Sequence, residues 1–121
     1  MEKVNGIGGL FFRAKDPEAL TAWYRDMLGV DSLPTVWQQR AGPTVLSPFP
    51  GESDYFPQGL QWMINFRVDN LPAMIAQLEA AGVEVTTNPE WDEHPEVGTF
   101  ARIYDPEGNP VELWQPGSPP E

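Results

Sequence analysis

Glu112 is the acidic residue whose sequence setting most favours chemistry. It stands between Val111 and Leu113, and because side chains alternate along a strand, it points to the face opposite these apolar neighbours. If that face lines a cavity, the carboxylate can act as a general base or anchor a ligand. The alternative is a solvated or arginine-paired carboxylate without a chemical role.

A second candidate is the acidic loop Asn88–Gly98, which holds the chain's one histidine, His94. His94 can be interpreted as a general base or as part of a cation-binding lid, since loops often carry function. A solvated acidic loop with an incidental histidine is the simpler interpretation, and we favour it. Trp91 in the same loop is the better indicator of a site, because an exposed indole usually covers something.

Composition excludes several classes of function. The 121 residues include no cysteine, which rules out disulfides, thiolate nucleophiles and cysteine-based metal sites. Eighteen acidic and seven basic side chains give a formal charge of −11, and so few cations cannot bind a nucleic-acid duplex or an anionic membrane. One histidine without a nucleophile-elbow motif forms no Ser–His–Asp triad.

The sequence predicts a cytoplasmic protein. The segment MEKVNGIGGLFF lacks the apolar region of a secretory signal. No apolar stretch reaches the roughly 20 residues that a membrane-spanning helix needs. A neutral or cationic small molecule is compatible with the negative charge, which acts mainly on solubility and steering.

Two blocks of the sequence recur in the same order, which indicates an internal duplication. Residues 10–30 run parallel to residues 64–83, and residues 42–46 run parallel to residues 108–112. Two independent matches in one order argue for a unit of roughly 55 residues that is used twice.

Runs of β-branched and aromatic residues predict the strands. Each unit opens with one, Ile7–Arg13 in the first and Trp62–Val68 in the second. The remaining predicted strands are Val36–Gln39, Thr44–Phe49, Val83–Thr86, Phe100–Tyr104 and Pro110–Trp114. The sequence DPEGN at residues 105–109 predicts a tight turn between the last two.

A helix follows the first strand of each unit. Asp16 and Asn70 are predicted N-caps, each with a proline in the first helical turn, where a missing N–H costs little. Gly29 and Gly82 are predicted to end the two helices in the left-handed conformation.

These elements predict a single α+β domain over residues 1–121. Module 1 spans about residues 4–50 and module 2 about residues 60–116, with the polar connector Pro50–Gly59 between them and a flexible tail at residues 117–121. Each module alone is too small to bury its sheet, so we expect the two sheets to join around a shared concavity.

This arrangement resembles the vicinal oxygen chelate superfamily, which includes glyoxalase I, the bleomycin-resistance proteins and the extradiol dioxygenases. The segment FFRAKDPEALTAWYRDMLGV in module 1 and the closing motif DPEGNPVELWQP in module 2 carry the resemblance. It implies two βαβββ modules that form a curved mixed sheet around a cleft, and it covers essentially the whole chain.

The resemblance also implies where a metal would bind. Metal-dependent members take one ligand from the first strand and one from the last strand of each module. The corresponding positions here are Gly9, Leu46, Met63 and Glu112. Only Glu112 suits a hard cation, because the others offer no side chain, an alkyl group and a soft thioether. We therefore expect no cofactor and regard a divalent metal as disfavoured.

The strand period of two places further side chains on the faces of Gly9, Met63 and Glu112. They are Phe11, Arg13, Gln61, Asn65, Arg67 and Trp114, with Trp37 and Phe49 near the corresponding strands of module 1. Together with Met63 and Trp91, they predict an aromatic-lined pocket with a few polar anchors, which is the usual composition of a small-ligand site. The alternative is that the aromatic rings fill the cleft as core.

Arg13 and Arg67 hold equivalent places in the two modules. They can clamp a substrate carboxylate, or one can pair with Glu112. We favour exposed strand-end residues, since arginine is common on surfaces.

Two functions from different classes follow. The first, which resembles the bleomycin-resistance branch, is metal-independent binding of a small cationic or aromatic molecule in a cleft between the modules. The second is a lyase or isomerase of the glyoxalase type that uses Glu112 as a base or metal ligand. In either case the resemblance implies a homodimer, and we expect neither nucleic acid nor a membrane as partner.

Overall fold

Local sequence signals set the two helices of the computed structural model, which describes residues 1–32 and 34–117. Helix α1 spans Pro17–Leu28 and helix α2 spans Leu71–Ala80. The side chains of Asp16 and Asn70 accept hydrogen bonds from the amides of Ala19 and Ala73, as N-caps do. Both predicted caps are confirmed. Gly29 ends α1 with a φ of 73°, the left-handed conformation that favours glycine.

Three strands form one mixed sheet in the order β1-β3-β2. Strand β1 (Ile64–Arg67) runs parallel to the central strand β3 (Pro110–Pro116), which pairs antiparallel with β2 (Gly98–Tyr104). In this register Asn65 lies opposite Glu112 on one side, and Arg102 lies opposite Glu112 on the other. Glu112 is therefore at the centre of the sheet.

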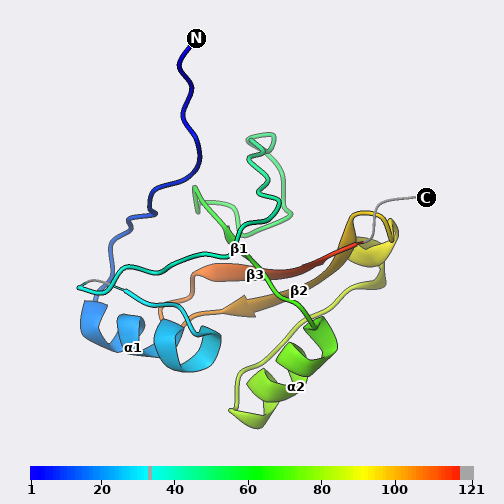
Figure 1. Ribbon diagram of the computed structural model, residues 1–121. Helices are drawn as coiled ribbons and strands as arrows, with labels where there is room; N and C mark the ends of the chain where they lie inside the picture. The colour runs from blue at the N-terminus through cyan, green and yellow to red at the C-terminus, as the bar shows by residue number, and fades with distance from the viewer. Residues whose placement is uncertain (33, 118–121) are drawn as a thin grey trace.

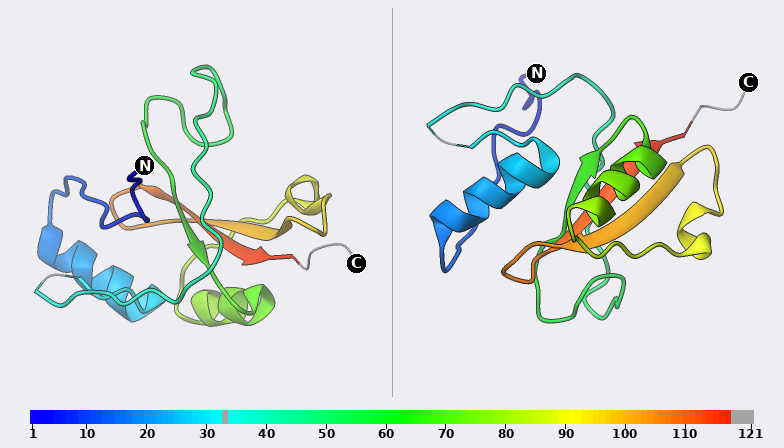
Figure 2. Two further views of the ribbon diagram at one scale, coloured as in Figure 1. Left: turned by 45° about the horizontal axis from the view of Figure 1, so that its top comes forward. Right: turned by 90° about the horizontal axis from the view of Figure 1, so that it is seen from below.

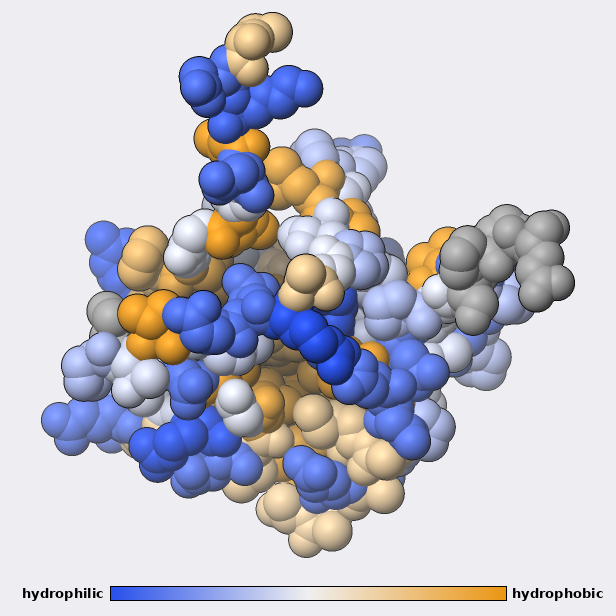
Figure 3. Space-filling view, viewed as in Figure 1, coloured by the Kyte–Doolittle hydropathy of each residue, from blue (hydrophilic) through white to orange (hydrophobic). Residues whose placement is uncertain are grey.

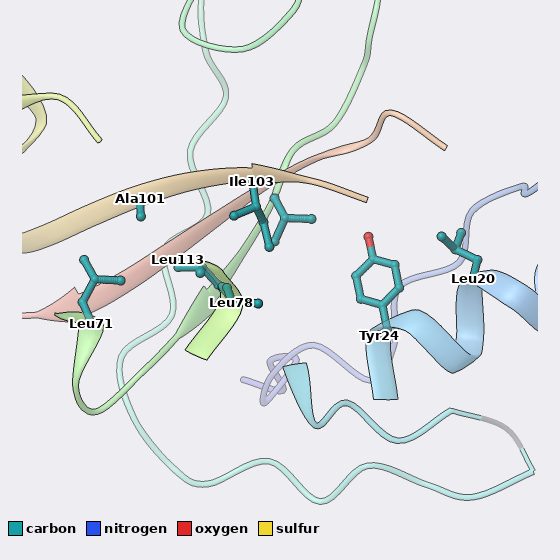
Figure 4. Packing of buried hydrophobic residues seen from close by; sticks show 8 residues of the cluster. Leu20, Tyr24, Leu71, Leu78, Ala101, Ile103 and Leu113 are labelled. Atoms are coloured by element: carbon teal, nitrogen blue, oxygen red, sulfur yellow. The ribbon is translucent and has the colours of Figure 1, made fainter. Parts of the chain in front are cut away.

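Helix α2 packs on one face of the sheet, and α1 lies to the side of the strands, near the β2–β3 turn (Figures 1 and 2). The core lies between the helices and the strands. The strands contribute Ala101, Ile103, Val111 and Leu113, all fully buried, and the helices contribute Leu20, Tyr24, Leu71 and Leu78. Figure 4 shows these helical side chains directed toward the strands. Burying one such leucine or isoleucine contributes about 1.5–3 kcal/mol, so this apolar face is what fixes the sheet on its helices.

The predicted turn at residues 105–109 joins β2 to β3 and also holds α1. The buried carboxylate of Asp105 accepts hydrogen bonds from the amides of Glu107 and Asn109 and from the Tyr24 hydroxyl of α1. The Glu107 carboxylate in turn accepts from the amides of Lys15 and Asp16, just before α1. One turn of module 2 thus fastens both the start and the middle of the helix of module 1.

The predicted strands of module 1 are absent from the described residues of this single chain. The segments Ile7–Arg13, Val36–Gln39 and Thr44–Phe49 are irregular, and Val83–Thr86 contributes only the bridge between Thr86 and Arg102. The physical reason is that a strand exists only through a partner strand, and the three paired strands all come from module 2. The mixed α+β class is confirmed, and the sheet is smaller than expected.

As a result, module 1 leaves many apolar side chains in solvent. Phe11 is 87% and Leu46 is 86% exposed. Figure 3 shows the first residues of the chain projecting from the body with apolar side chains uncovered. The other exposed large apolar residues before residue 63 are Met1, Val4, Ile7, Leu10, Phe12, Val36, Trp37, Val45, Phe49, Leu60 and Trp62.

Within residues 1–32 and 34–117, neither helix has the length and apolar character that crossing a membrane requires. Of the predicted tail, Gly117 is described, and residues 118–121 lie outside the described part of the chain.

Candidate functional site

The face of the sheet that points away from the helices carries polar and aromatic side chains. Alternation along each strand sends them there, because their neighbours Ala101, Ile103, Val111 and Leu113 enter the core. We call this surface the Glu112 face. Its members are Asn65 and Arg67 from β1, Phe100 and Arg102 from β2, and Glu112 and Trp114 from β3.

Glu112 is a buried carboxylate with two hydrogen-bond donors. It is 7% exposed, and its oxygens accept from the Asn65 side-chain amide at 2.7 Å and from the Tyr55 hydroxyl. Burial, followed by the hydrogen bond to Glu112 and its negative charge, raises the pKa of Tyr55. The Tyr55 hydroxyl therefore keeps its proton at neutral pH and remains a donor to the carboxylate.

Arg102 is a buried cation beside Glu112. It is 5% exposed, and its Nη2 donates to the main-chain carbonyl of Tyr55 at 2.9 Å. Its guanidinium carbon lies 5.3 Å from the centre of the Tyr55 ring and 5.5 Å from the centre of the Trp91 ring, at cation–π range. Its Nε is buried and has no hydrogen-bond partner among the described residues.

Aromatic rings from two loops cover this pair of charges. Tyr55 belongs to the connector at residues 50–59, which lies on the side of the sheet opposite the helices (Figures 1 and 2). Trp91 belongs to the short helix η1 (Pro89–Asp92), and its ring centre is 6.1 Å from that of Tyr55. Phe49 extends the group, 5.5 Å from Tyr55. The charges are thus enclosed by rings, with little water access.

The structure brings together part of the predicted site. Phe49, Asn65, Trp91 and Glu112 converge as described. Trp114 lies on the same face, but it stacks on Phe100 and donates through Nε1 to the carbonyl of Val97 at 2.9 Å.

Arg67 lies at the edge of the Glu112 face. Its side chain donates to the carbonyl of Arg40 at 2.9 Å and not to the residues around Glu112.

Other predicted members lie elsewhere. Trp37 packs 5.9 Å from Phe66, whose strand position is on the helix side of the sheet. Phe11, Arg13 and Gln61 are exposed, because the segments that contain them are unpaired here. Met63 is half-buried just before β1. His94 stays in its exposed loop, 3.6 Å from the Glu96 carboxylate.

Sequence reasoning missed Arg102 and Tyr55. Arg102 could have been found, since a charged residue that alternates with Ala101 and Ile103 in a buried strand must point to the second face. Tyr55 gave no such signal, because it stands in a Pro- and Gly-rich connector without a strand period.

The residues around Glu112 do not fit a divalent metal. Of the positions that metal-dependent relatives use, Leu46 is in solvent and Met63 is a thioether. Both Glu112 oxygens already accept hydrogen bonds, and the neighbouring cation of Arg102 would repel a metal ion. Across residues 1–32 and 34–117, no three histidine or acidic side chains gather closely enough to hold one.

Glu112 and Arg102 are covered in this conformation, at 7% and 5% exposure, and two surface hollows lie away from Glu112. One of about 320 Å³ borders the start of α2 and includes Arg40 and Arg67. Another of about 420 Å³ lies between Trp23, Tyr104 and the segment after α2. Because both charged groups are buried, the Tyr55 and Trp91 rings leave a ligand little direct access to them.

Comparison with known proteins places the chain in a family. The family model described as a glyoxalase-like domain matches residues 9–114. No curated protein matches the chain in sequence.

Ten chains of solved structures are similar to it, and two of them come from Streptomyces sp. CB03234. TnmS3, an antibiotic binding protein, is 24% identical with a TM-score of 0.63, over 97% of this chain and 100% of that one. A glyoxalase/bleomycin resistance protein is 26% identical with a TM-score of 0.50, over 84% of this chain and 92% of that one. The family model spans both modules and includes the strands that carry Asn65, Arg102 and Glu112, so this chain belongs to the glyoxalase-like domain family.

Proposed function

We propose that this protein binds a small aromatic molecule against the Glu112 face, without a metal ion and without chemical turnover. The observation that carries this proposal is the group of rings around two buried charges. Tyr55 and Trp91 flank the Arg102 guanidinium, and Glu112 lies beside it. Aromatic rings around a few convergent polar groups are typical of small-ligand sites.

Energetics support a role in binding. A buried arginine and a buried glutamate each lose hydration on folding, and well-packed apolar residues in their place would often make the fold more stable. The Arg102 Nε is not compensated by any hydrogen bond from the described residues. Buried charged groups that cost stability and lie against aromatic rings support a ligand-binding role for this face.

The similar structures point the same way. One is described as an antibiotic binding protein and another as a glyoxalase/bleomycin resistance protein. Their names support a small-molecule ligand for this chain, and its donor set argues against a metal at the same place. The net charge of −11 favours the approach of cations, whereas the rings select aromatic character.

Calorimetric titration tests the proposal. Two probes with one ring system, 2-naphthylmethylammonium and 2-acetyl-6-hydroxynaphthalene, are titrated into the wild-type protein, Trp91→Ala and Trp62→Ala. We expect binding of at least one probe, weakened severalfold and up to about tenfold by Trp91→Ala, since stacking on an aromatic ring contributes about 0.5–1.5 kcal/mol. Trp62, an exposed indole outside the site, is the matched control. Failure of both probes, or an equal loss in both variants, would contradict the proposal.

The metal-free part has its own test. Elemental analysis of dialysed protein should give transition metals at background level. Near-stoichiometric nickel, zinc, manganese or iron would mean that other residues complete a site around Glu112, and would move the function toward metal-dependent chemistry.

A lyase or isomerase of the glyoxalase type is the second candidate, and the buried carboxylate of Glu112 favours it. Burial in an enclosed site is the setting of many general bases. The assay is conversion of the hemithioacetal of methylglyoxal and glutathione, followed by absorbance of the thioester. Turnover that Glu112→Gln abolishes, with the fold retained, would replace the binding function by this one.

We further propose that the protein is a homodimer. The strand-patterned segments of module 1 lack strand partners within the described chain and leave Phe11 and Leu46 in solvent. A second copy offers edges to which such segments can add as strands, which would bury apolar surface and satisfy main-chain groups. Sedimentation equilibrium should give twice the 13.5 kDa chain mass. A monomer at micromolar concentration would contradict this proposal.

A further inference from the structure

Tyr55 makes the kinds of contact that a bound ligand would be expected to make on the Glu112 face. Its hydroxyl donates to Glu112, its main-chain carbonyl accepts from Arg102 Nη2 at 2.9 Å, and its ring lies against the guanidinium. All three contacts come from one residue of the connector, which is not part of the sheet.

We propose that Tyr55 is a built-in occupant of the ligand site, and that the ligand is a phenolic aromatic molecule with an acceptor oxygen, which displaces it. This inference rests on the proposed binding function and names its ligand class. The hydroxyl of such a molecule would replace the Tyr55 hydroxyl at Glu112. Its carbonyl or ether oxygen would replace the Tyr55 carbonyl at Arg102.

The connector is built so that it can leave as a unit. Its hydrogen bonds are largely internal, from the Ser53 amide to the Pro50 carbonyl at 2.9 Å and from the Gln58 side chain to the Glu52 carbonyl at 3.0 Å. The Tyr55 amide donates to the Ser53 hydroxyl at 3.2 Å. These bonds persist if the segment moves, so opening the site costs the contacts of Tyr55 and the packing of Phe56 on Phe49.

The rest of the site stays in place when the connector moves. Arg102 and Glu112 are opposite each other on paired strands, and Asn65 holds Glu112 from the other side. Groups on a sheet keep their geometry better than groups on a loop. The donor and acceptor that Tyr55 releases therefore remain positioned for a ligand.

Arg102 gives the ligand an advantage over Tyr55. The Tyr55 carbonyl satisfies Nη2, but the buried Nε has no partner among the described residues. A ligand whose acceptor oxygen reaches Nε adds a hydrogen bond that Tyr55 does not make. A hydrogen bond to the buried Nε offsets the free energy that its desolvation costs, so replacing Tyr55 by the ligand is favoured.

The competition predicts an unusual order of affinities. An occupied site binds ligand with an affinity reduced by the fraction of molecules that are open. Removing the occupant therefore raises affinity, whereas removing a true wall of the site lowers it. We expect Tyr55→Ala to bind 2-acetyl-6-hydroxynaphthalene on the order of tenfold more tightly than wild type at pH 7.

Two variants make the test specific. Tyr55→Phe keeps the ring and loses the donor to Glu112, so its gain in affinity for the probe should lie between those of wild type and Tyr55→Ala. If Tyr55→Ala loses its cooperative melting transition, the affinity of Tyr55→Phe tests the inference instead. Asp54→Ala is the matched control, because Asp54 is the exposed neighbour of Tyr55 on the same connector. It should leave the affinity within about twofold of wild type.

The methyl ether of the probe tests the phenolic hydroxyl. In Tyr55→Ala it should bind on the order of tenfold more weakly than the free phenol, because it cannot donate to Glu112 and hydrogen bonds to charged groups are the stronger ones. Glu112→Gln in the same background should bring the two probes to within a fewfold of each other.

The outcomes separate the two proposals. If wild type binds the phenol and both Tyr55 variants bind it equally or more weakly, Tyr55 is a wall of the site and this inference is wrong, while the binding function stands. Preference for the ether or for 2-naphthylmethylammonium also overturns the phenolic class alone. If the wild-type protein binds neither 2-acetyl-6-hydroxynaphthalene nor 2-naphthylmethylammonium, the proposed function itself fails.

Discussion

The hydroxyl of Tyr24 on α1 donates a 2.7 Å hydrogen bond to the carboxylate of Asp105 in the β2–β3 turn, across 81 positions of sequence. Both residues are buried. Asp105 also accepts from the Asn109 side-chain amide at 2.7 Å. A single carboxylate thereby closes its own turn and receives the helix of the other module.

Tyr24→Phe removes this link without opening a cavity. We expect it to lower the free energy of unfolding by about 1–3 kcal/mol, since the bond joins a hydroxyl to a buried charged acceptor. Urea denaturation measures the change. Tyr104→Phe, at an exposed position of β2, is the control and should stay within about 0.5 kcal/mol of wild type. Equal effects in the two variants would show that the Tyr24 hydroxyl contributes nothing specific.

The buried hydroxyls of Tyr24 and Tyr55 predict that the folded protein loses stability at high pH. Burial and acidic neighbours raise the pKa of Tyr24 and Tyr55 above the usual value near 10. Above about pH 10 the unfolded chain has lost these protons while the folded chain still holds them, so the stability is complete below that pH and falls as pH rises. Urea unfolding at a series of pH values should show this decline, with a shallower slope in Tyr24→Phe. A slope that Tyr24→Phe leaves unchanged would assign the decline to other groups.

Arg102→Met should affect both stability and binding. The thioether side chain fills similar space but leaves the buried carboxylate of Glu112 without its neighbouring cation. We therefore expect the free energy of unfolding to fall, by up to about 3–5 kcal/mol. Binding of an acceptor-bearing aromatic probe should weaken on the order of tenfold, because the donor to the acceptor oxygen is gone. Thermal melting and calorimetry on the same preparation give both quantities. A large loss of stability with unchanged affinity would make Arg102 a structural residue.

Phe11→Ser and Leu46→Ser test the homodimer. Both side chains are in solvent in the single chain, so the stability of a monomer should hardly change. If a second copy buries them, each substitution removes apolar contact of about 1.5–3 kcal/mol per copy, and the dimer should dissociate at higher concentration than wild type. Sedimentation equilibrium over a dilution series measures the shift. Lys3→Ser, an exposed polar change in the same segment, is the control.

Features that depend on near neighbours in sequence could be predicted, and features that depend on distant contacts could not. Three to five consecutive residues determine each of the helix caps at Asp16 and Asn70 and the turn at residues 105–109. All three features are present in the structure. Alternation along the strand predicted that Glu112 points to the face of the sheet away from its neighbours Val111 and Leu113. The hydrogen bond from Asn65, on that face, confirms this orientation.

The strands of module 1 show the limit of such local signals. An alternating apolar pattern says that a segment favours an extended conformation, but it names no partner, and hydrogen-bond pairing is what makes a strand. Tyr55 shows the same limit in the site. Its contact with Glu112 spans 57 positions and depends on how a connector without periodic structure folds back.

The sheet register has a consequence for the order in which the chain folds. The β2–β3 hairpin closes over a turn of five residues, whereas pairing β1 with β3 joins Asn65 to Glu112 across 47 positions and docking α1 spans 81. Because closure entropy rises with the length of the loop, the hairpin is expected to form early, and α1 to dock onto an already assembled Asp105 turn. Leu20→Ala should then accelerate unfolding and leave the refolding rate nearly unchanged, whereas Val111→Ala should slow refolding, as stopped-flow measurements can establish. The Asp105 turn is thus expected to form first and then to serve as the surface onto which α1 docks.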